Sequence, residues 1–176
     1  EGFDGNDCVI CMNGNCRFNP TEVFETRFPW VVEDFAMTPD SGGAGKFRGG
    51  LGLYREYTIN TDGFVSLWFE RSVTPAWGLF GGKDGQPPNV NVKIPNEDEK
   101  NLLKANGLQI KKGTVLTTYT GGGGGFEDSL ERDPENVLND VKNRYVSIEK
   151  AKEDYKVSIT SDLEIDQNAT EKLRNN

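Results

Sequence analysis

Glycine is concentrated in one short stretch of this chain, and that stretch limits the folds available to it. Six glycines fall within residues 42–52, spaced Gly-Gly-x-Gly-x-x-x-Gly-Gly-x-Gly, with Lys46 and Arg48 between them. Glycine at this density lets one backbone pass close to another, or adopt positive φ, where a side chain would clash. We therefore expect a tight backbone crossing that leads into a β-sheet. A loop that binds an anion or a partner is the alternative, since main-chain N–H groups and two cations would favour an anion.

A nucleotide-binding loop is a third interpretation of these glycines. Such a loop places its glycines between a strand and the N-terminus of a helix. Residues 51–60 instead alternate apolar and polar side chains, which is typical of a strand. The pattern therefore argues against a phosphate-binding loop at this position.

A second glycine run, residues 121–125, consists of five glycines in succession. This run has no side chains with which to do chemistry. We expect either a flexible segment or a close-packed extended segment, because polyproline-II geometry leaves the backbone free to pair with neighbours. A phosphate-binding nest of N–H groups is the functional alternative.

Most of the remaining chain up to residue 120 has the pattern of β-strands. Residues 20–28 are expected to be extended. A hairpin with a turn at Asp62-Gly63 is predicted, since this dipeptide favours a tight reversal. Its strands and the other expected strands cover residues 30–36, 51–60, 64–71, 89–94, 107–113 and 114–120. Leu102 and Leu103 are interpreted as one helical turn.

Two short helices are predicted near the C-terminus. Asp133 followed by Pro134 is a typical helix start, and Ser147 can cap a second helix that runs through Tyr155. Residues 157–160 are expected to add a short strand. Residues 162–176 are polar and are expected to form a mobile tail.

The composition excludes several classes of function. The net charge is −8 and there is no run of basic residues, so neither nucleic acid nor an anionic membrane surface is an expected partner. No apolar run approaches the length of a membrane span and no signal-peptide pattern is present, so a cytoplasmic protein is expected. Only 35% of the residues are hydrophobic and 21 are glycine, which favours a fold whose faces are completed by other chains.

The sequence contains no histidine. A Ser-His-Asp triad, a Cys-His pair and a histidine-ligated metal are therefore excluded within this chain. The chain also begins without Met, which predicts a fragment or a processed product. A complete active site is not expected here.

The three cysteines, Cys8, Cys11 and Cys16, are spaced C-x2-C-x4-C. Two thiolates two residues apart can share a tetrahedral Zn²⁺, and the third cysteine could be another ligand. A closed site would need a fourth ligand from Asp7, a water or another chain. Reduced thiols or a redox pair are the alternatives.

Several motifs resemble one protein family in the same order. Residues 40–52 (DSGGAGKFRGGLG) resemble the C-terminal part of the hydantoinase B family, whose members are subunits or domains of ATP-dependent hydantoinases, 5-oxoprolinases, and acetone and acetophenone carboxylases. Further segments that fit this resemblance are residues 19–25, 77–82, 121–126, 130–135 and 146–155. The cysteine trio departs from the family pattern.

The resemblance implies both a fold and a division of labour. It implies β-sheets in a barrel-like arrangement that continue into extended, glycine-rich segments. It also implies a larger, hydantoinase-A-like partner subunit that binds ATP and phosphorylates the substrate, while the hydantoinase-B-like subunit contributes the site of hydrolysis or carboxylation. The family's metal ligands lie in an N-terminal part that this chain lacks.

We therefore expect a mainly β (α+β) fold with polyproline-II-like segments and two short C-terminal helices. Four regions are expected: a Cys/Gly-rich segment (1–19), a glycine-rich β domain (20–130), a short helical element (131–160) and a polar tail (161–176).

The functional hypothesis is a small subunit, or C-terminal part, of a multi-subunit ATP-dependent enzyme of this family. It would complete a site together with the ATP-binding chain and the remainder of the hydantoinase-B-like subunit. The motifs do not separate a cyclic-amide hydrolase from a ketone carboxylase, although a split form favours the carboxylase. The candidate anion-contacting or domain-positioning residues are Asp40, Ser41, Lys46, Arg48 and Arg71. The alternatives are a non-catalytic assembly subunit and a zinc-stapled module.

Overall fold

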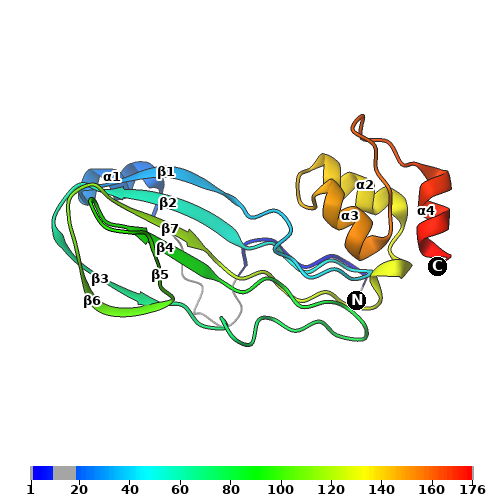
Figure 1. Ribbon diagram of the computed structural model, residues 1–176, viewed down its shortest axis with the longest axis horizontal. Helices are drawn as coiled ribbons and strands as arrows, with labels where there is room; N and C mark the ends of the chain where they lie inside the picture. The colour runs from blue at the N-terminus through cyan, green and yellow to red at the C-terminus, as the bar shows by residue number, and fades with distance from the viewer. Residues whose placement is uncertain (1, 10–18, 176) are drawn as a thin grey trace.

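The structure, a computed structural model, describes residues 2–9 and 19–175 of the 176-residue chain. The molecule is elongated, with the β-strands and one short α-helix at one end, the other α-helices at the opposite end and long extended segments between them (Figure 1). Among the described residues, no helix is both long enough and apolar enough to span a membrane. The mainly β (α+β) fold class is confirmed.

The β-strands form two antiparallel sheets. Within the described residues the larger sheet has the order β1-β2-β7-β4-β5, made of Trp30–Met37, Leu53–Ile59, Thr114–Tyr119, Asn89–Lys93 and Lys100–Asn101. The smaller pairs β3 (Gly63–Trp68) with β6 (Lys104–Ile110). Between them lies an apolar cluster of Ile59, Leu67, Val90, Val92, Ile94, Ile110 and Leu116. The larger sheet is open, with β1 and β5 at its edges, so the barrel-like arrangement is not a closed barrel.

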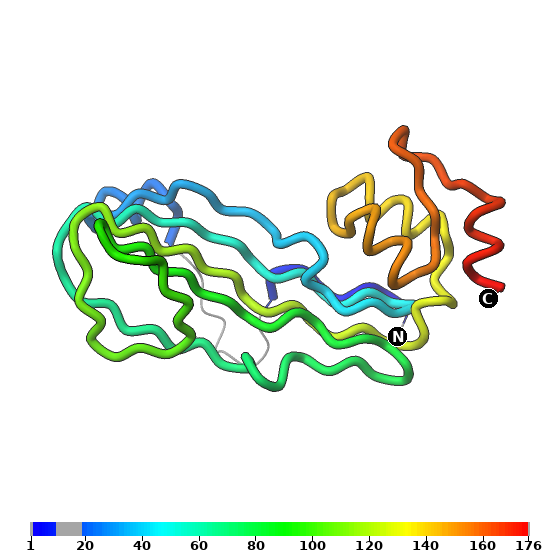
Figure 2. Tube along the Cα trace, in the orientation of Figure 1, coloured from blue at the N-terminus to red at the C-terminus, as the bar shows by residue number. Residues whose placement is uncertain are grey.

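The extended segments between the sheets and the helices form what we call the glycine bundle, residues 4–8, 41–52, 76–86 and 121–127. They run side by side (Figure 2) and exchange backbone hydrogen bonds, such as Gly43 N–H to Gly123 O (2.8 Å) and Gly125 N–H to Lys83 O (2.8 Å). A Cβ atom on Gly124 would lie far inside van der Waals contact with the carbonyl of Trp77. The close-packed interpretation of the second glycine run is therefore confirmed.

The helical end contains the 3₁₀-helix η1 (Ser129–Glu131), α2 (Pro134–Lys142), α3 (Ile148–Tyr155) and α4 (Gln167–Arg174). The predicted caps are confirmed: Asp133 accepts from the Glu135 N–H, and Ser147 accepts from the Lys150 N–H. A second apolar cluster holds this end together: Ala44, Val137, Leu138, Val141, Val146, Ala151, Tyr155, Val157 and Ile159.

The predicted hairpin is wrong. Strand β2 pairs with β1 and β7, whereas β3 pairs with β6. Gly63 does not adopt positive φ, and the carboxylate of Asp62 accepts from the Lys112 N–H (2.7 Å) instead of closing a tight turn. The chain passes here from the larger sheet to the smaller one, where Leu67 belongs to the apolar cluster and Val65 packs against it.

Two further expectations need correction. Residues 20–28 hold a short helix, α1 (Thr21–Arg27), which places the Phe24 ring against Trp30 and Tyr57. Within the expected tail, residues 162–175 are not a simple tail: Asp166 caps α4, and Thr170 accepts a hydrogen bond from the Ser158 N–H (3.0 Å).

The smaller expected elements also differ from the structure. Leu102 and Leu103 lie in the connection between β5 and β6 rather than in a helical turn. The strand expected at residues 157–160 is reduced to one bridge between Ile159 and Ile165.

Candidate functional site

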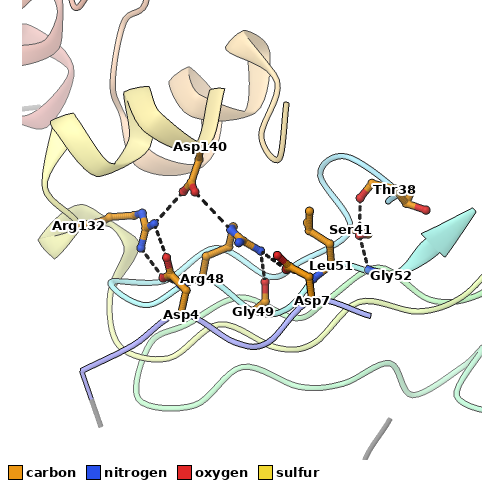
Figure 3. Close-up of polar contacts among 10 residues, drawn as sticks. All are labelled: Asp4, Asp7, Thr38, Ser41, Arg48, Gly49, Leu51, Gly52, Arg132 and Asp140. Carbon is orange, nitrogen blue, oxygen red and sulfur yellow. Dashed lines mark hydrogen bonds and ion pairs between the residues drawn. The ribbon is translucent and has the colours of Figure 1, made fainter. Parts of the chain in front are cut away.

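Two buried arginines connect the glycine bundle to the helical end. Arg48 lies in the bundle and Arg132 directly before α2, and their side chains are only 3% and 4% exposed. Asp140 of α2 lies between them, 2.8 Å from Arg132 Nη2 and 3.6 Å from Arg48 Nε (Figure 3). A buried cation is tolerated when it is paired and hydrogen-bonded, so these three groups depend on one another.

The N-terminal segment completes this ionic network. Arg132 donates to both carboxylate oxygens of Asp4, at 2.7 and 2.8 Å, and to the carbonyl of Lys46 at 2.9 Å. Such bidentate pairs fix geometry as well as charge. Asp4 also accepts from the Arg48 N–H at 2.7 Å. The segment at residues 4–8 is thereby attached to the bundle and to α2 together.

Arg48 has a second set of contacts along the bundle. It donates to Asp7 Oδ1 (3.1 Å) and to the carbonyl of Gly49 (2.7 Å). Its guanidinium also lies over the ring of Tyr145, 5.2 Å from the ring centroid. We refer to Asp4, Asp7, Arg48, Arg132 and Asp140 as the ionic network.

Burial and pairing act in opposite directions on the carboxylates of the ionic network. Burial opposes the charge on Asp4, but the hydrogen bonds and charge of Arg132, together with Arg48, outweigh it and hold the pKa of Asp4 below its usual value. Burial raises the pKa of Asp140, although Arg132 and Arg48 oppose that change. Desolvation alone would lower the pKa of Arg132. Its hydrogen bonds to Asp4 and the negative charge of Asp140 outweigh this effect, so the pKa of Arg132 is raised.

Asp40 and Ser41 are used inside the fold. Asp40 Oδ1 accepts from the Ser147 N–H (2.7 Å), and the Asp40 N–H donates to Tyr145 O (2.9 Å), so this residue joins the bundle to the start of α3. Ser41 is buried, donates to Thr38 O (2.6 Å) and accepts from the Gly52 N–H (2.9 Å). Both side chains therefore position backbone segments.

Lys46 and Arg71 are the two candidates that face solvent. Hydrogen bonds from Lys46 to Glu131 (3.0 Å) and its contact with Glu127 (3.1 Å) raise the pKa of its amine. Arg71 has φ 61° and lies over the ring of Trp77, 5.2 Å from the centroid. Arg71 is not part of the ionic network, so the five candidates do not form one cluster.

A hollow of about 280 Å³ lies beside the ionic network. It is lined by Gly2, Phe3, Asp4, Lys46, Phe47, Arg132, Asn136, Asn139 and Asp140. Of the charged groups that reach it, Arg132 is already paired with Asp4 and Asp140, and Lys46 is paired with two acidic residues outside the lining, Glu127 and Glu131. A charged ligand here would have to displace these internal partners. We therefore interpret the hollow as the place where the N-terminal segment, the glycine bundle and α2 meet, and not as a ligand-binding pocket.

The zinc hypothesis falls mostly outside the described residues. Cys8 is described and exposed, while Cys11 and Cys16 lie outside the described range. Partial desolvation and the charge of the neighbouring Asp7 raise the pKa of the Cys8 thiol, which disfavours the thiolate that binds metal. Among the described residues, no group of three or more histidine, cysteine or carboxylate side chains is placed to hold a metal ion.

None of Asp4, Arg132 and Asp140 is a site candidate from the sequence, although Arg132 lies in the family-like segment 130–135. One signal was available for Asp140: it lies on α2 three residues from Val137 and next to Val141, both buried. A carboxylate on the apolar face of a helix requires a cation. Its partner Arg132 lies only eight residues earlier in the chain. The other carboxylate of this cation, Asp4, could not be found by pattern, because it lies 128 residues from Arg132.

The arrangement defines a class of protein unit: an antiparallel β-structure joined to a helical cap through a packed bundle of glycine segments. Residues 1–129 match the family described as hydantoinase B/oxoprolinase, and the chain belongs to that family. The chain is 33% identical, over 98% of its length, to the B component of a candidate D-/L-hydantoinase from Pseudomonas sp. (strain NS671).

Solved structures share this fold. A nucleotide-free acetone carboxylase superposes on 98% of the chain with a TM-score of 0.82 and 22% identity. The ATP-dependent caprolactamase of Pseudomonas jessenii superposes on 98% of the chain with a TM-score of 0.77 and 25% identity. The chain spans 30% of the hydantoinase relative, 28% of the acetone carboxylase chain and 33% of the caprolactamase chain.

Proposed function

We propose that this chain forms the C-terminal part, or a separately encoded small subunit, of the hydantoinase-B-like component of a multi-subunit ATP-dependent enzyme. One observation carries the proposal: nearly the whole chain aligns with about 30% of the B component of a hydantoinase. The unit would complete an active site formed mainly by other chains, and the isolated chain would be inactive. Such an ATP-consuming complex is expected in the cytoplasm.

The proposed reaction is the ATP-dependent opening of a cyclic amide. The sequence identity is 33% to the hydantoinase relative and 22% to the acetone carboxylase. The similarity to the acetone carboxylase supports a shared fold only. A ketone carboxylase is the runner-up, because both branches share the glycine motifs.

ATP would bind to the larger hydantoinase-A-like subunit rather than to this chain. The N–H groups of Gly43, Gly123 and Gly125 already donate to main-chain carbonyls, so they are not free to hold a phosphate. In this proposal the glycine segments hold the chain's own backbone together and do not bind nucleotide.

The first experiment is native mass spectrometry of the protein purified from its source under mild conditions, with metal analysis of the same sample. The expected result is co-purification with a large ATP-binding chain and with the remaining hydantoinase-B-like sequence. The complex should release ADP when hydantoin, 5-oxoproline or caprolactam is opened; ADP release only with acetone and bicarbonate would favour the carboxylase. A monomer with one bound zinc and no partners would contradict the proposal.

A non-catalytic assembly subunit is the second candidate. The observation that favours it is that Ser41 and Arg48, two of the predicted site residues, are buried and paired within the fold. Lys46→Ala in the assembled complex separates the two candidates, since this side chain is exposed. Loss of turnover with the complex intact would support a contribution to the active site, whereas unchanged turnover would favour the assembly role.

A further inference from the structure

Strand β3 carries large aromatic side chains on the face that points to solvent. Successive side chains of a strand alternate between its two faces. On β3 the inner positions, Val65 and Leu67, pack on the apolar cluster, while Phe64 and Trp68 are 75% and 82% exposed. A solvent-facing strand surface is normally polar, so these two rings need an explanation.

The exposed apolar surface continues into the segment after β3. Val73 is 90% exposed and Trp77 is 61% exposed, and the Arg71 guanidinium lies over the Trp77 ring. This segment leads from β3 along the lower edge of the molecule in Figure 1. We call Phe64, Trp68, Arg71, Val73 and Trp77 the aromatic stripe.

The aromatic stripe has the composition of an interface centre. Monomeric proteins rarely expose contiguous apolar patches larger than about a few hundred Å², and exposed large apolar side chains that gather on neighbouring segments are typical of interaction sites. Tryptophan and arginine are enriched among the residues that dominate binding energy. An ion pair between Glu70 and Lys104 (3.0 Å) lies beside the stripe and supplies the polar rim usual for such a surface.

We propose that the aromatic stripe docks this unit onto the remainder of the hydantoinase-B-like subunit; the inference rests on the proposed function. In the two solved neighbours, the same fold makes up only 28% and 33% of a longer chain. Under the proposed function, the remainder of the subunit packs against some face of this unit. The stripe gathers several of the most exposed large apolar side chains of the described residues, so burying it would give a substantial hydrophobic gain.

Fluorine NMR provides a direct test, because the chain contains only three tryptophans. Two of them, Trp68 and Trp77, belong to the stripe, whereas Trp30 packs inside the fold against Phe24 and Tyr57. The chain would be labelled with 5-fluorotryptophan and mixed with the purified, unlabelled remainder of its hydantoinase-B-like subunit. The Trp68 and Trp77 resonances are expected to shift while Trp30 stays. A formed complex in which both stripe resonances are unchanged would overturn the inference.

Variants supply the second test. Trp68→Ser and Trp77→Ser should each weaken binding to the same remainder at least roughly tenfold. Leu130→Ser is the matched control, because Leu130 is 43% exposed at the helical end, and its binding should equal that of the wild type. Thermal unfolding of each isolated variant should be close to the wild type, since the altered side chains are exposed.

The outcomes separate this inference from the proposed function. Equal binding by the wild type and both stripe variants, with ATP-dependent turnover retained, overturns the docking surface and leaves the proposed function standing. A wild type that does not bind the remainder at all overturns both. Self-association of the wild type that is lost in Trp68→Ser would overturn the proposed occupant in favour of a second copy of this chain.

Discussion

Arg132 joins parts of the chain that are distant in sequence. Its guanidinium contacts Asp4 and Asp140, and its main-chain carbonyl accepts from Arg174 of α4 (2.8 Å). Lys46 and Arg48 among the glycines made anion binding the alternative to a tight backbone crossing. The anions that meet these two cations are the protein's own carboxylates: Glu127 and Glu131 pair with Lys46, and Asp7 and Asp140 pair with Arg48, the latter shared with Arg132.

The first prediction concerns the loss of this cation. Arg132→Ala leaves the carboxylates of Asp4 and Asp140 without their main partner, so it should lower the free energy of unfolding by about 3–5 kcal/mol. Lys46→Ala is the control, since its ion pairs are exposed and should contribute little. Urea denaturation followed by circular dichroism measures both. Equal effects of the two substitutions would contradict a special role for the buried network.

The second prediction concerns pH. The pKa of Asp4 is lower in the folded protein than its unfolded value near 3.9, so the unfolded chain binds more protons across that interval. The stability that Asp4 contributes is present above the unfolded pKa and falls as the pH drops through the folded pKa. The stability difference between the wild type and Asp4→Asn should therefore shrink as the pH falls below about 4. A difference that grows on acidification would refute this assignment.

Among the elements, the glycine bundle leaves the least room for substitution. Its segments pack main chain to main chain, so the third prediction is that Gly124→Ala costs more than about 3 kcal/mol or prevents folding, because the added Cβ meets the Trp77 carbonyl. Gly63→Ala is the matched control, since a Cβ there has open space and Gly63 lacks positive φ. Thermal unfolding of the two variants compares them. Similar midpoint temperatures would show that the backbone of the bundle can shift to accommodate the added Cβ.

Local signals in the sequence predicted many elements correctly. Helix caps at Asp133 and Ser147 act through nearest neighbours, and the alternation of residues 89–94 and 114–120 reflects which side chains reach the core. The Asp62-Gly63 signal failed because strand pairing depends on distant segments. β3 is held by β6, and no local pattern encodes that choice.

At the scale of the whole molecule, the two apolar clusters lie at opposite ends with the bundle between them (Figure 1). The fourth prediction is that Val90→Ala in the sheet cluster and Val137→Ala in the helical cluster each cost about 2 kcal/mol. Because the sites share no partners, the double variant should show the sum within about 0.5 kcal/mol. Guanidinium unfolding of the three variants measures this, and a larger departure would reveal coupling through the bundle.

The glycine bundle also has a consequence for the order of events during folding. Its hydrogen bonds join Gly5 to Arg48, Ala44 to Lys83 and Gly43 to Gly123, so several long loops must close before the bundle gains any stability. The helices at the C-terminal end need no such closure. In pulse-labelling hydrogen exchange during refolding, the amides of α2 should gain protection first and those of Gly43 and Gly123 last. On the ribosome, the bundle can close only once residue 125 has emerged.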